Sequence, residues 1–193
     1  LSPIDGRYAR QTDALRDIFS ECAFMNARVR VEVEWLISLS EAGFAELPHL
    51  SDHGKAFLRG LADNFSLADC EAIKEIEKTT NHDVKAVEYW IKNQVAHDEE
   101  LKSASEFVHF SCTSEDINNT SHAIMLKRGR EALADYLQQI HDTIAGFAHQ
   151  WAEIPMLSRT HGQTASPTTV GKEFANVAVR LERVIEAIRA VKI

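Results

Sequence analysis

Glycine and proline are scarce in this sequence, with eight glycines and four prolines among 193 residues. Both residues interrupt regular structure, so their scarcity indicates long, continuous elements. The sequence also lacks runs of alternating polar and apolar residues bounded by turn residues, which disfavours strands. Apolar residues recur instead at steps of three and four, and this spacing predicts an all-α fold.

Positive charge is also in deficit, because 21 Lys and Arg face 29 Asp and Glu and give a formal net charge of -8. An acidic surface repels phosphate backbones, so nucleic acid is not an expected partner. No apolar run approaches the ~20 residues that span a membrane, and no signal peptide is recognisable. We therefore expect a cytoplasmic protein that does not contact membranes.

Cysteine is the next scarce residue. Cys22, Cys70 and Cys112 are odd in number and share no spacing typical of metal ligands. We expect free or buried thiols in a reducing compartment. Neither an HExxH motif nor a paired-cysteine motif accompanies the nine histidines, so we expect no metal site. No glycine-rich phosphate loop is present either, which argues against an NTPase or a dinucleotide enzyme.

The first half of the chain predicts a helical domain. One long amphipathic helix is indicated by Leu15, Ile18, Phe19, Cys22, Met25, Val29, Val33 and Leu36. Segment 43–54 contains Pro48 and two glycines and breaks the pattern. Shorter helices are predicted over 57–64 and 67–78, and a further one after the cluster 79–83. The polar stretch 98–105 follows, so we place the N-terminal domain at residues 1–102.

The second half, residues 103–193, predicts the first part of a long helical bundle. Thr113 and Asp116 match a capping signature before a helix from Glu115 to about Arg130. A heptad-like apolar stripe follows, and such a stripe predicts packing against a partner helix. It is formed by Leu133, Leu137, Ile140, Ile144, Phe147 and Trp151. Residues 154–167 are predicted as a loop, with Ser166 and Pro167 capping the last helix. That helix carries the stripe Val170, Phe174, Val177, Leu181, Val184 and Ile188.

Three polar clusters, 79–83, 111–116 and 159–166, are each predicted in the turn that opens a helix. Such turns expose free N–H groups and favour phosphates and carboxylates. Simple helix capping explains any single cluster equally well. Three clusters rich in His, Asn, Thr and Ser favour a functional role.

Individual residues in these clusters suit acid–base chemistry and anion binding. His161 stands beside Gly162, which permits backbone geometry that brings an imidazole close to a ligand. An unperturbed imidazole, with a pKa of about 6.5, suits proton transfer near neutral pH. Asn81, His82 and Asp83 offer an amide, an imidazole and a carboxylate in a row. The alternatives are an ordinary surface histidine for His161 and a helix cap for Asn81.

The N-terminal stretch adds a further candidate pair. Arg7 and Tyr8 could supply a guanidinium and a phenol to a phosphate or carboxylate. Arg7 could equally bind an acidic helix.

A family resemblance rests on four strings: SPIDGRY, TTNHDVKAVEYW, EFVHFSCTSEDINN and SRTHGQTASPTTVGKEFANVA. In this order they resemble the adenylosuccinate lyases of the fumarase/aspartase superfamily, over residues 2–183. TTNHD and TSEDINN point to this group more than to argininosuccinate lyase or fumarase. One departure is Thr164, which stands where many relatives have proline.

The resemblance implies a cofactor-independent C–N lyase of purine biosynthesis, which eliminates fumarate from adenylosuccinate and from the succinyl-carboxamide ribotide. It implies that His161 protonates the leaving amine. Thr113 and Ser114 would hydrogen-bond the succinyl group. The nucleotide would be bound by Asn81, His82, Asp83, Arg7 and Tyr8.

The resemblance also implies a homotetramer in which three subunits build each active site. The family signature GSSxMPxKxNP and the serine base do not occur in these 193 residues. We therefore expect an N-terminal fragment that is inactive by itself. Two alternatives stay open, another lyase of the superfamily such as argininosuccinate lyase, and a non-catalytic helical module used for assembly.

Overall fold

The structure is a computed structural model that describes residues 2–47 and 49–193. Leu1 and Pro48, which belong to the predicted N-terminal domain and to the predicted break at 43–54, lie outside these ranges. The chain divides into two compact units, Leu1–Leu126 and Lys127–Ile193. The predicted domains, 1–102 and 103–193, have different limits and stay a prediction.

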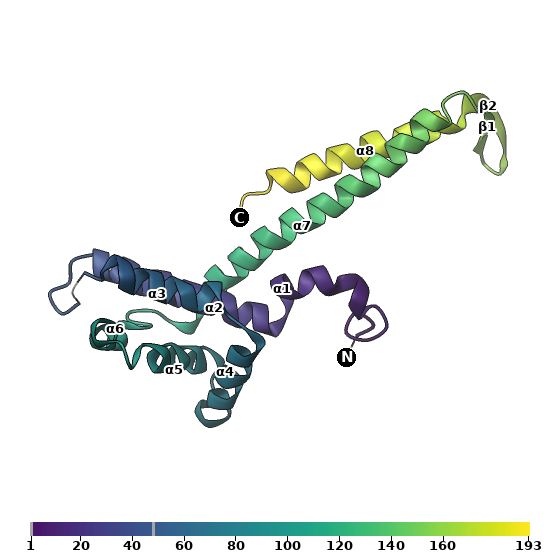
Figure 1. The fold of residues 1–193 in the computed structure, drawn as a ribbon. Helices are drawn as coiled ribbons and strands as arrows, with labels where there is room; N and C mark the ends of the chain where they lie inside the picture. The colour runs from purple at the N-terminus through teal and green to yellow at the C-terminus, as the bar shows by residue number, and fades with distance from the viewer. Residues whose placement is uncertain (1, 48) are drawn as a thin grey trace. The chain divides into compact units, whose positions relative to one another are not determined.

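The fold is helical apart from one β-hairpin (Figure 1). The elements of the first unit are the 3₁₀ helix η1 (Ala9–Leu15), α1 (Arg16–Phe19), α2 (Glu21–Glu41), α3 (Asp52–Asp63), α4 (Leu67–Thr80), α5 (Asp83–Val95), α6 (Glu99–Ala104), η2 (Ser105–Phe107) and the start of α7 (Ser114–Gln150). The second unit contains the rest of α7, β1 (Pro155–Thr160), β2 (Gln163–Thr169) and α8 (Val170–Ala190). None of the described helices is both long enough and apolar enough to cross a membrane.

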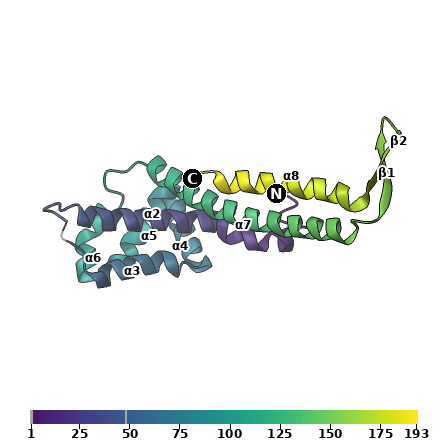
Figure 2. The ribbon, with the colours of Figure 1, turned by 90° about the horizontal axis from the view of Figure 1, so that it is seen from above.

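Helix α2 forms the centre of the first unit and contacts α3, α4 and α5 (Figures 1 and 2). Its apolar face supplies Val29, Val33 and Leu36, each at most 1% exposed, to the core. Facing side chains in this core include Leu58 of α3, Ile73 of α4 and Ile91 of α5. The 3–4 spacing read from the sequence therefore does mark the buried face of this helix.

The predicted helix over residues 15–36 is interrupted at Ser20, which corrects the sequence prediction. Ser20 has an extended backbone (φ -71, ψ 162), and its hydroxyl accepts the N–H of Ala23. A serine that caps a helix in this way stabilises a new helix start. Helix α1 therefore ends at Phe19 and α2 begins at Glu21.

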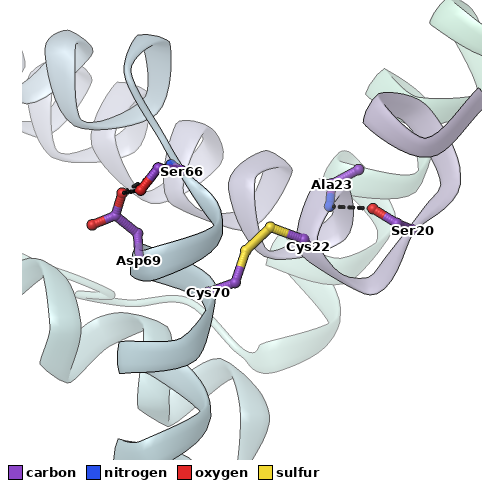
Figure 3. Close-up of a disulfide and its surroundings, with 6 residues drawn as sticks. All are labelled: Ser20, Cys22, Ala23, Ser66, Asp69 and Cys70. Atoms are coloured by element: carbon purple, nitrogen blue, oxygen red, sulfur yellow. Dashed lines mark hydrogen bonds between the residues drawn. A yellow bond between two sulfur atoms is a disulfide. The ribbon is translucent and has the colours of Figure 1, made fainter. Parts of the chain in front are cut away.

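The cysteines also differ from the prediction. Cys22 in α2 and Cys70 in α4 form a disulfide, drawn in Figure 3, and Cys112 is free. Their Cα atoms lie 5.6 Å apart, although 48 positions separate them in the chain. Sequence spacing could not indicate this pairing, because it results from the packing of α4 against α2.

The loop predicted over residues 154–167 is instead the hairpin β1–β2. The two strands are antiparallel, with Thr160 opposite Gln163 and a bulge between Leu157 and Arg159. Most of their side chains are exposed, so the strands lack the buried apolar face that sequence patterns detect. The last helix accordingly starts later than predicted, and Thr169, not Ser166, caps α8 by accepting the N–H of Lys172.

In the second unit α8 runs alongside α7 in both views (Figures 1 and 2). The Phe174 ring contacts Phe147 and Trp151, which belong to the predicted heptad-like stripe. The buried residues of α8 are Gly171, Ala178 and Ile185. Val177 and Val184 of the predicted α8 stripe are about half exposed, at 49% and 52%. The buried face of α8 is therefore rotated from the predicted one.

Candidate active site

His82 lies at the junction of α4 and α5. Asn81 ends α4 in the left-handed conformation (φ 49), and His82 then caps α5 with an extended backbone. The His82 Nδ1 atom accepts the backbone N–H of Lys85 at 3.2 Å. Because Nδ1 is an acceptor, the neutral ring carries its proton on Nε2. The cap therefore leaves a donor N–H at the far end of the ring.

Thr113 and Ser114 begin α7. The Thr113 backbone N–H and hydroxyl both donate to Asp116 Oδ2, at 2.7 and 2.9 Å. These two hydrogen bonds hold the pKa of Asp116 below its ordinary value. One of the two reciprocal bonds of the predicted capping box is thus formed, in which Asp116 accepts the Thr113 backbone N–H, and this bond holds the backbone at Ser114.

These two helix starts meet. The His82 Nε2 atom lies 3.5 Å from the Ser114 Oγ atom. This distance is at the outer limit of a hydrogen bond, so both groups remain available to a third partner. The fold therefore brings the predicted clusters 79–83 and 111–116 together.

Arg28 of α2 connects the same two helix starts and was not predicted. Its Nε donates to Asn118 Oδ1 at 2.9 Å, and its Nη2 donates to Asp83 Oδ2 at 2.5 Å. Burial acts to raise the pKa of Asp83, but the Arg28 charge and hydrogen bonds from Val84, Arg28 and Asp83 itself outweigh it, so the pKa is lowered. Asn118 stands in the motif TSEDINN and could have been found there. Arg28 has no local signal, because it lies within an ordinary helical pattern.

The segment before Thr113 is anchored by a contact between a histidine and a buried carboxyl group. His109, in the left-handed conformation (φ 65), places its Nδ1 atom 2.6 Å from Glu32 Oε1 of α2. Glu32 is buried, and this burial raises the pKa of its carboxyl group. The pair ties the approach to α7 onto α2.

A cavity of about 390 Å³ opens beside His82. It is lined by Glu21, Phe24, Met25, Arg28, Glu77, Asn81, His82 and Asp83. Lys74 pairs with Glu21 at 2.9 Å and with Glu77 at 2.8 Å, which offsets their negative charge. A second cavity, of about 540 Å³ and mainly apolar lining, lies between α2 and the start of α7 and does not include His82. Ser114 lines neither of these two cavities. We assign the site to the smaller cavity, because its polar groups can act on a ligand.

His161 lies at the tip of the hairpin in the second unit. His161 and Gly162 both have positive φ (50 and 76) and connect Thr160 to Gln163. Positive φ at both central residues is the requirement of a type I′ turn. Glycine adopts positive φ freely, and histidine is one of the few other residues enriched there. Cluster 159–166 is therefore not a helix-opening turn as predicted. The hairpin instead presents an exposed imidazole in a constrained backbone.

Arg7 and Tyr8 lie in the N-terminal turns of the first unit, and both are exposed. The Arg7 Cζ atom is 5.6 Å from the centre of the Tyr8 ring. The side-chain hydrogen bonds of His82 and Ser114 go to Lys85 and to each other, and none goes to Arg7 or Tyr8. Within residues 2–47 and 49–193, no three His, Cys, Asp or Glu side chains are grouped to hold a metal ion. The predicted nucleotide-binding role of Arg7 and Tyr8 stays a prediction.

Comparison with known proteins gives close sequence relatives. A family model described as lyase matches residues 6–192. The chain is 52% identical over 195 residues to an adenylosuccinate lyase of Vibrio cholerae, covering 100% of this chain and 43% of that protein. It is 55% identical over 185 residues to the Haemophilus influenzae enzyme of that name, covering 95% of this chain and 41% of that protein. The chain thus spans less than half the length of these relatives.

Solved structures agree on the fold. A fumarate lyase from Mesorhizobium superimposes with a TM-score of 0.73 at 19% identity, covering 92% of this chain and 39% of that one. A β-carboxy-cis,cis-muconate cycloisomerase from Acinetobacter calcoaceticus gives a TM-score of 0.73 at 20% identity, covering 93% of this chain and 40% of that one. At this identity the likeness concerns the helical architecture alone.

Proposed function

The chain belongs to the lyase family, and we propose that it forms part of a C–N lyase that cleaves adenylosuccinate to AMP and fumarate. The observation that carries the proposal is identity of 51–55% to adenylosuccinate lyases over 95–100% of the chain. The site adds polar groups suited to an anionic substrate. We extend the proposal to the succinyl-carboxamide ribotide of purine synthesis, and to a cytoplasmic homotetramer.

The reaction is a β-elimination. A base removes a proton from the carbon next to a carboxylate of the succinyl group, and that electron pair forms the double bond of fumarate. The C–N bond breaks, and its electron pair moves to nitrogen, which takes a proton from an acid. In our proposal His161 is this acid. The base in our proposal is a serine near the family signature GSSxMPxKxNP. These 193 residues do not contain that segment, so we expect them to show no turnover by themselves.

Ser114 and His82 are proposed to hold the substrate. With Nδ1 occupied by the cap, the His82 Nε2–H can donate to an anionic oxygen beside Ser114. Thr113 would act with Ser114 on the succinyl carboxylates, where developing negative charge requires donors. Asn81 and Asp83 would contact the nucleotide, together with Arg7 and Tyr8.

The direct test is to express the complete gene product that contains this sequence and to measure fumarate release. We expect release from adenylosuccinate and none from argininosuccinate. Release from argininosuccinate only would assign the protein to that other lyase of the superfamily instead.

A non-catalytic assembly module is the second candidate. It is supported by apolar side chains left exposed on α7 and α8, including Leu133, Ile140 and Val184 at 47%, 51% and 52%. His161→Ala in the complete gene product separates the candidates. If His161 is the catalytic acid, kcat should fall by about 10²-fold or more. The control is His97→Ala, because His97 is also exposed, and this variant should keep the wild-type kcat. Equal turnover of both variants with the wild type would favour the module.

A further inference from the structure

Arg28 is a buried cation in the wall of the candidate site. Its side chain is 5% exposed, whereas that of its partner Asp83 is 50% exposed. The guanidinium Cζ atom lies 3.9 Å from the centre of the Phe24 ring, and that ring stacks on His122 at 4.5 Å. A buried charge is costly unless each of its contacts is well placed. This arginine is held by an aromatic face and by two polar partners.

The two polar partners belong to different helix starts. Asp83 is the first residue of α5 and follows the cap His82 directly. Asn118 lies four positions after Ser114 in α7, so the two side chains share one face of that helix. One rigid guanidinium therefore fixes the separation of the α5 and α7 starts, at the place where His82 Nε2 and Ser114 Oγ approach each other.

We propose that Arg28 is a positioning residue, which orients His82 and Ser114 toward one substrate group by joining Asp83 to Asn118. This inference rests on the proposed function. Arginine is required because its planar fork serves two partners in fixed directions, whereas lysine offers a single point charge. The guanidinium acts through the two helix starts.

The test is Arg28→Lys in the complete gene product, assayed with adenylosuccinate. We expect kcat to fall about 10- to 100-fold, since a displacement of about 1 Å in a site can have an effect of this size. KM should change less, by about threefold. The matched control is Arg59→Lys, because Arg59 also joins two helices through a two-point contact, to Glu34 at 2.7 and 2.9 Å, but away from the site. We expect the control to keep the wild-type kcat.

Asn118→Ala provides a second variant that keeps the Arg28–Asp83 pair. We expect it to lower kcat without lowering the unfolding midpoint, and the Arg28→Lys/Asn118→Ala double variant to be no slower than Arg28→Lys alone. A purely structural role predicts instead that activity falls only with the folded fraction. Normal kcat per folded enzyme in both single variants would overturn the proposal.

Hydrogen exchange decides the question even without substrate turnover. We expect the amide of Lys85, which donates to His82, to exchange about tenfold faster in Arg28→Lys and at the wild-type rate in Arg59→Lys. If the wild type fails to cleave adenylosuccinate, the proposed function fails, and this exchange rate still tests the positioning role. Unchanged exchange at Lys85 in Arg28→Lys would refute that role.

Discussion

The His82 imidazole and the Ser114 hydroxyl face each other at 3.5 Å across 32 positions of sequence. Each group stands at the start of a helix, His82 before α5 and Ser114 at the beginning of α7. Two helix N-termini therefore converge on one place, where the positive ends of both helix dipoles lie. This arrangement favours an anionic ligand, in agreement with the dicarboxylate of the proposed substrate.

Ser114 and His82 should act as a coupled pair. We expect Ser114→Ala and His82→Ala each to lower kcat/KM of the complete gene product on adenylosuccinate. The double variant should lose less than the sum, with a coupling of about 0.5–3 kcal/mol, because both groups serve one substrate oxygen. The exposed Ser103→Ala, combined with His82→Ala, provides the additive control. If the losses from Ser114→Ala and His82→Ala simply add in the double variant, the two residues do not act on the same substrate oxygen.

Glu32 should make stability fall as pH rises. Burial raises the pKa of Glu32 in the folded state above 4.5, its value in the unfolded chain. At pH values between the unfolded and the folded pKa, the folded state therefore binds more protons than the unfolded state. The free energy of unfolding therefore decreases through that window. Glu32→Gln removes the titration, so its stability relative to wild type should improve as pH rises above 4.5. Urea unfolding at a series of pH values measures this.

Glu34 on the same helix is the matched control for this slope. A hydrogen bond from Arg59 lowers the pKa of Glu34 below 4.5. Its stabilising contribution is therefore present above 4.5 and is lost as pH falls through the native pKa. Glu34→Gln should lose stability relative to wild type at neutral pH, and this loss should vanish in acid. Parallel slopes for the two variants would contradict both assignments.

The disulfide predicts a thiol count. Protein unfolded and alkylated without reductant should show one reactive thiol, Cys112, and protein reduced before alkylation should show three. The Cys112→Ser variant should show no reactive thiol without reductant and two after reduction. Three thiols before reduction would restore the expectation drawn from the sequence and remove the covalent link between α2 and α4.

Gly171 should resist substitution. A Cβ atom there would lie 2.3 Å from the Ala148 carbonyl oxygen and 2.5 Å from the Ala152 Cα atom, so backbone would have to move. We expect Gly171→Ala to destabilise the fold by about 1–3 kcal/mol. Gly146→Ala, which meets nothing within 4 Å in α7, should instead stabilise by about 0.5–1 kcal/mol. Thermal unfolding of both variants measures the contrast, and equal stabilities would show that α7 and α8 do not pack this closely.

Helix positions in the first unit were predictable, since the buried face of α2 follows from the spacing of Val29, Val33 and Leu36. The hairpin was not, because exposed strands leave no alternating pattern. Candidate site residues could be recognised from the sequence, because polar and titratable side chains gather where helices are predicted to begin. Their partners could not be selected, because Arg28 and Glu32 look like ordinary polar positions of a helix until α5 and α7 pack against it.

The sequence by itself determined the helical class, the capping of α7 by Thr113 and Asp116, and the four strings that indicate a lyase, because these depend on neighbours within a few positions. Only the tertiary structure decided that Cys22 meets Cys70, that Arg28 joins Asp83 to Asn118, and that His82 faces Ser114. The physical reason is that these contacts join residues 32 to 90 positions apart. Helix packing brings such residues together, and local spacing carries no record of it.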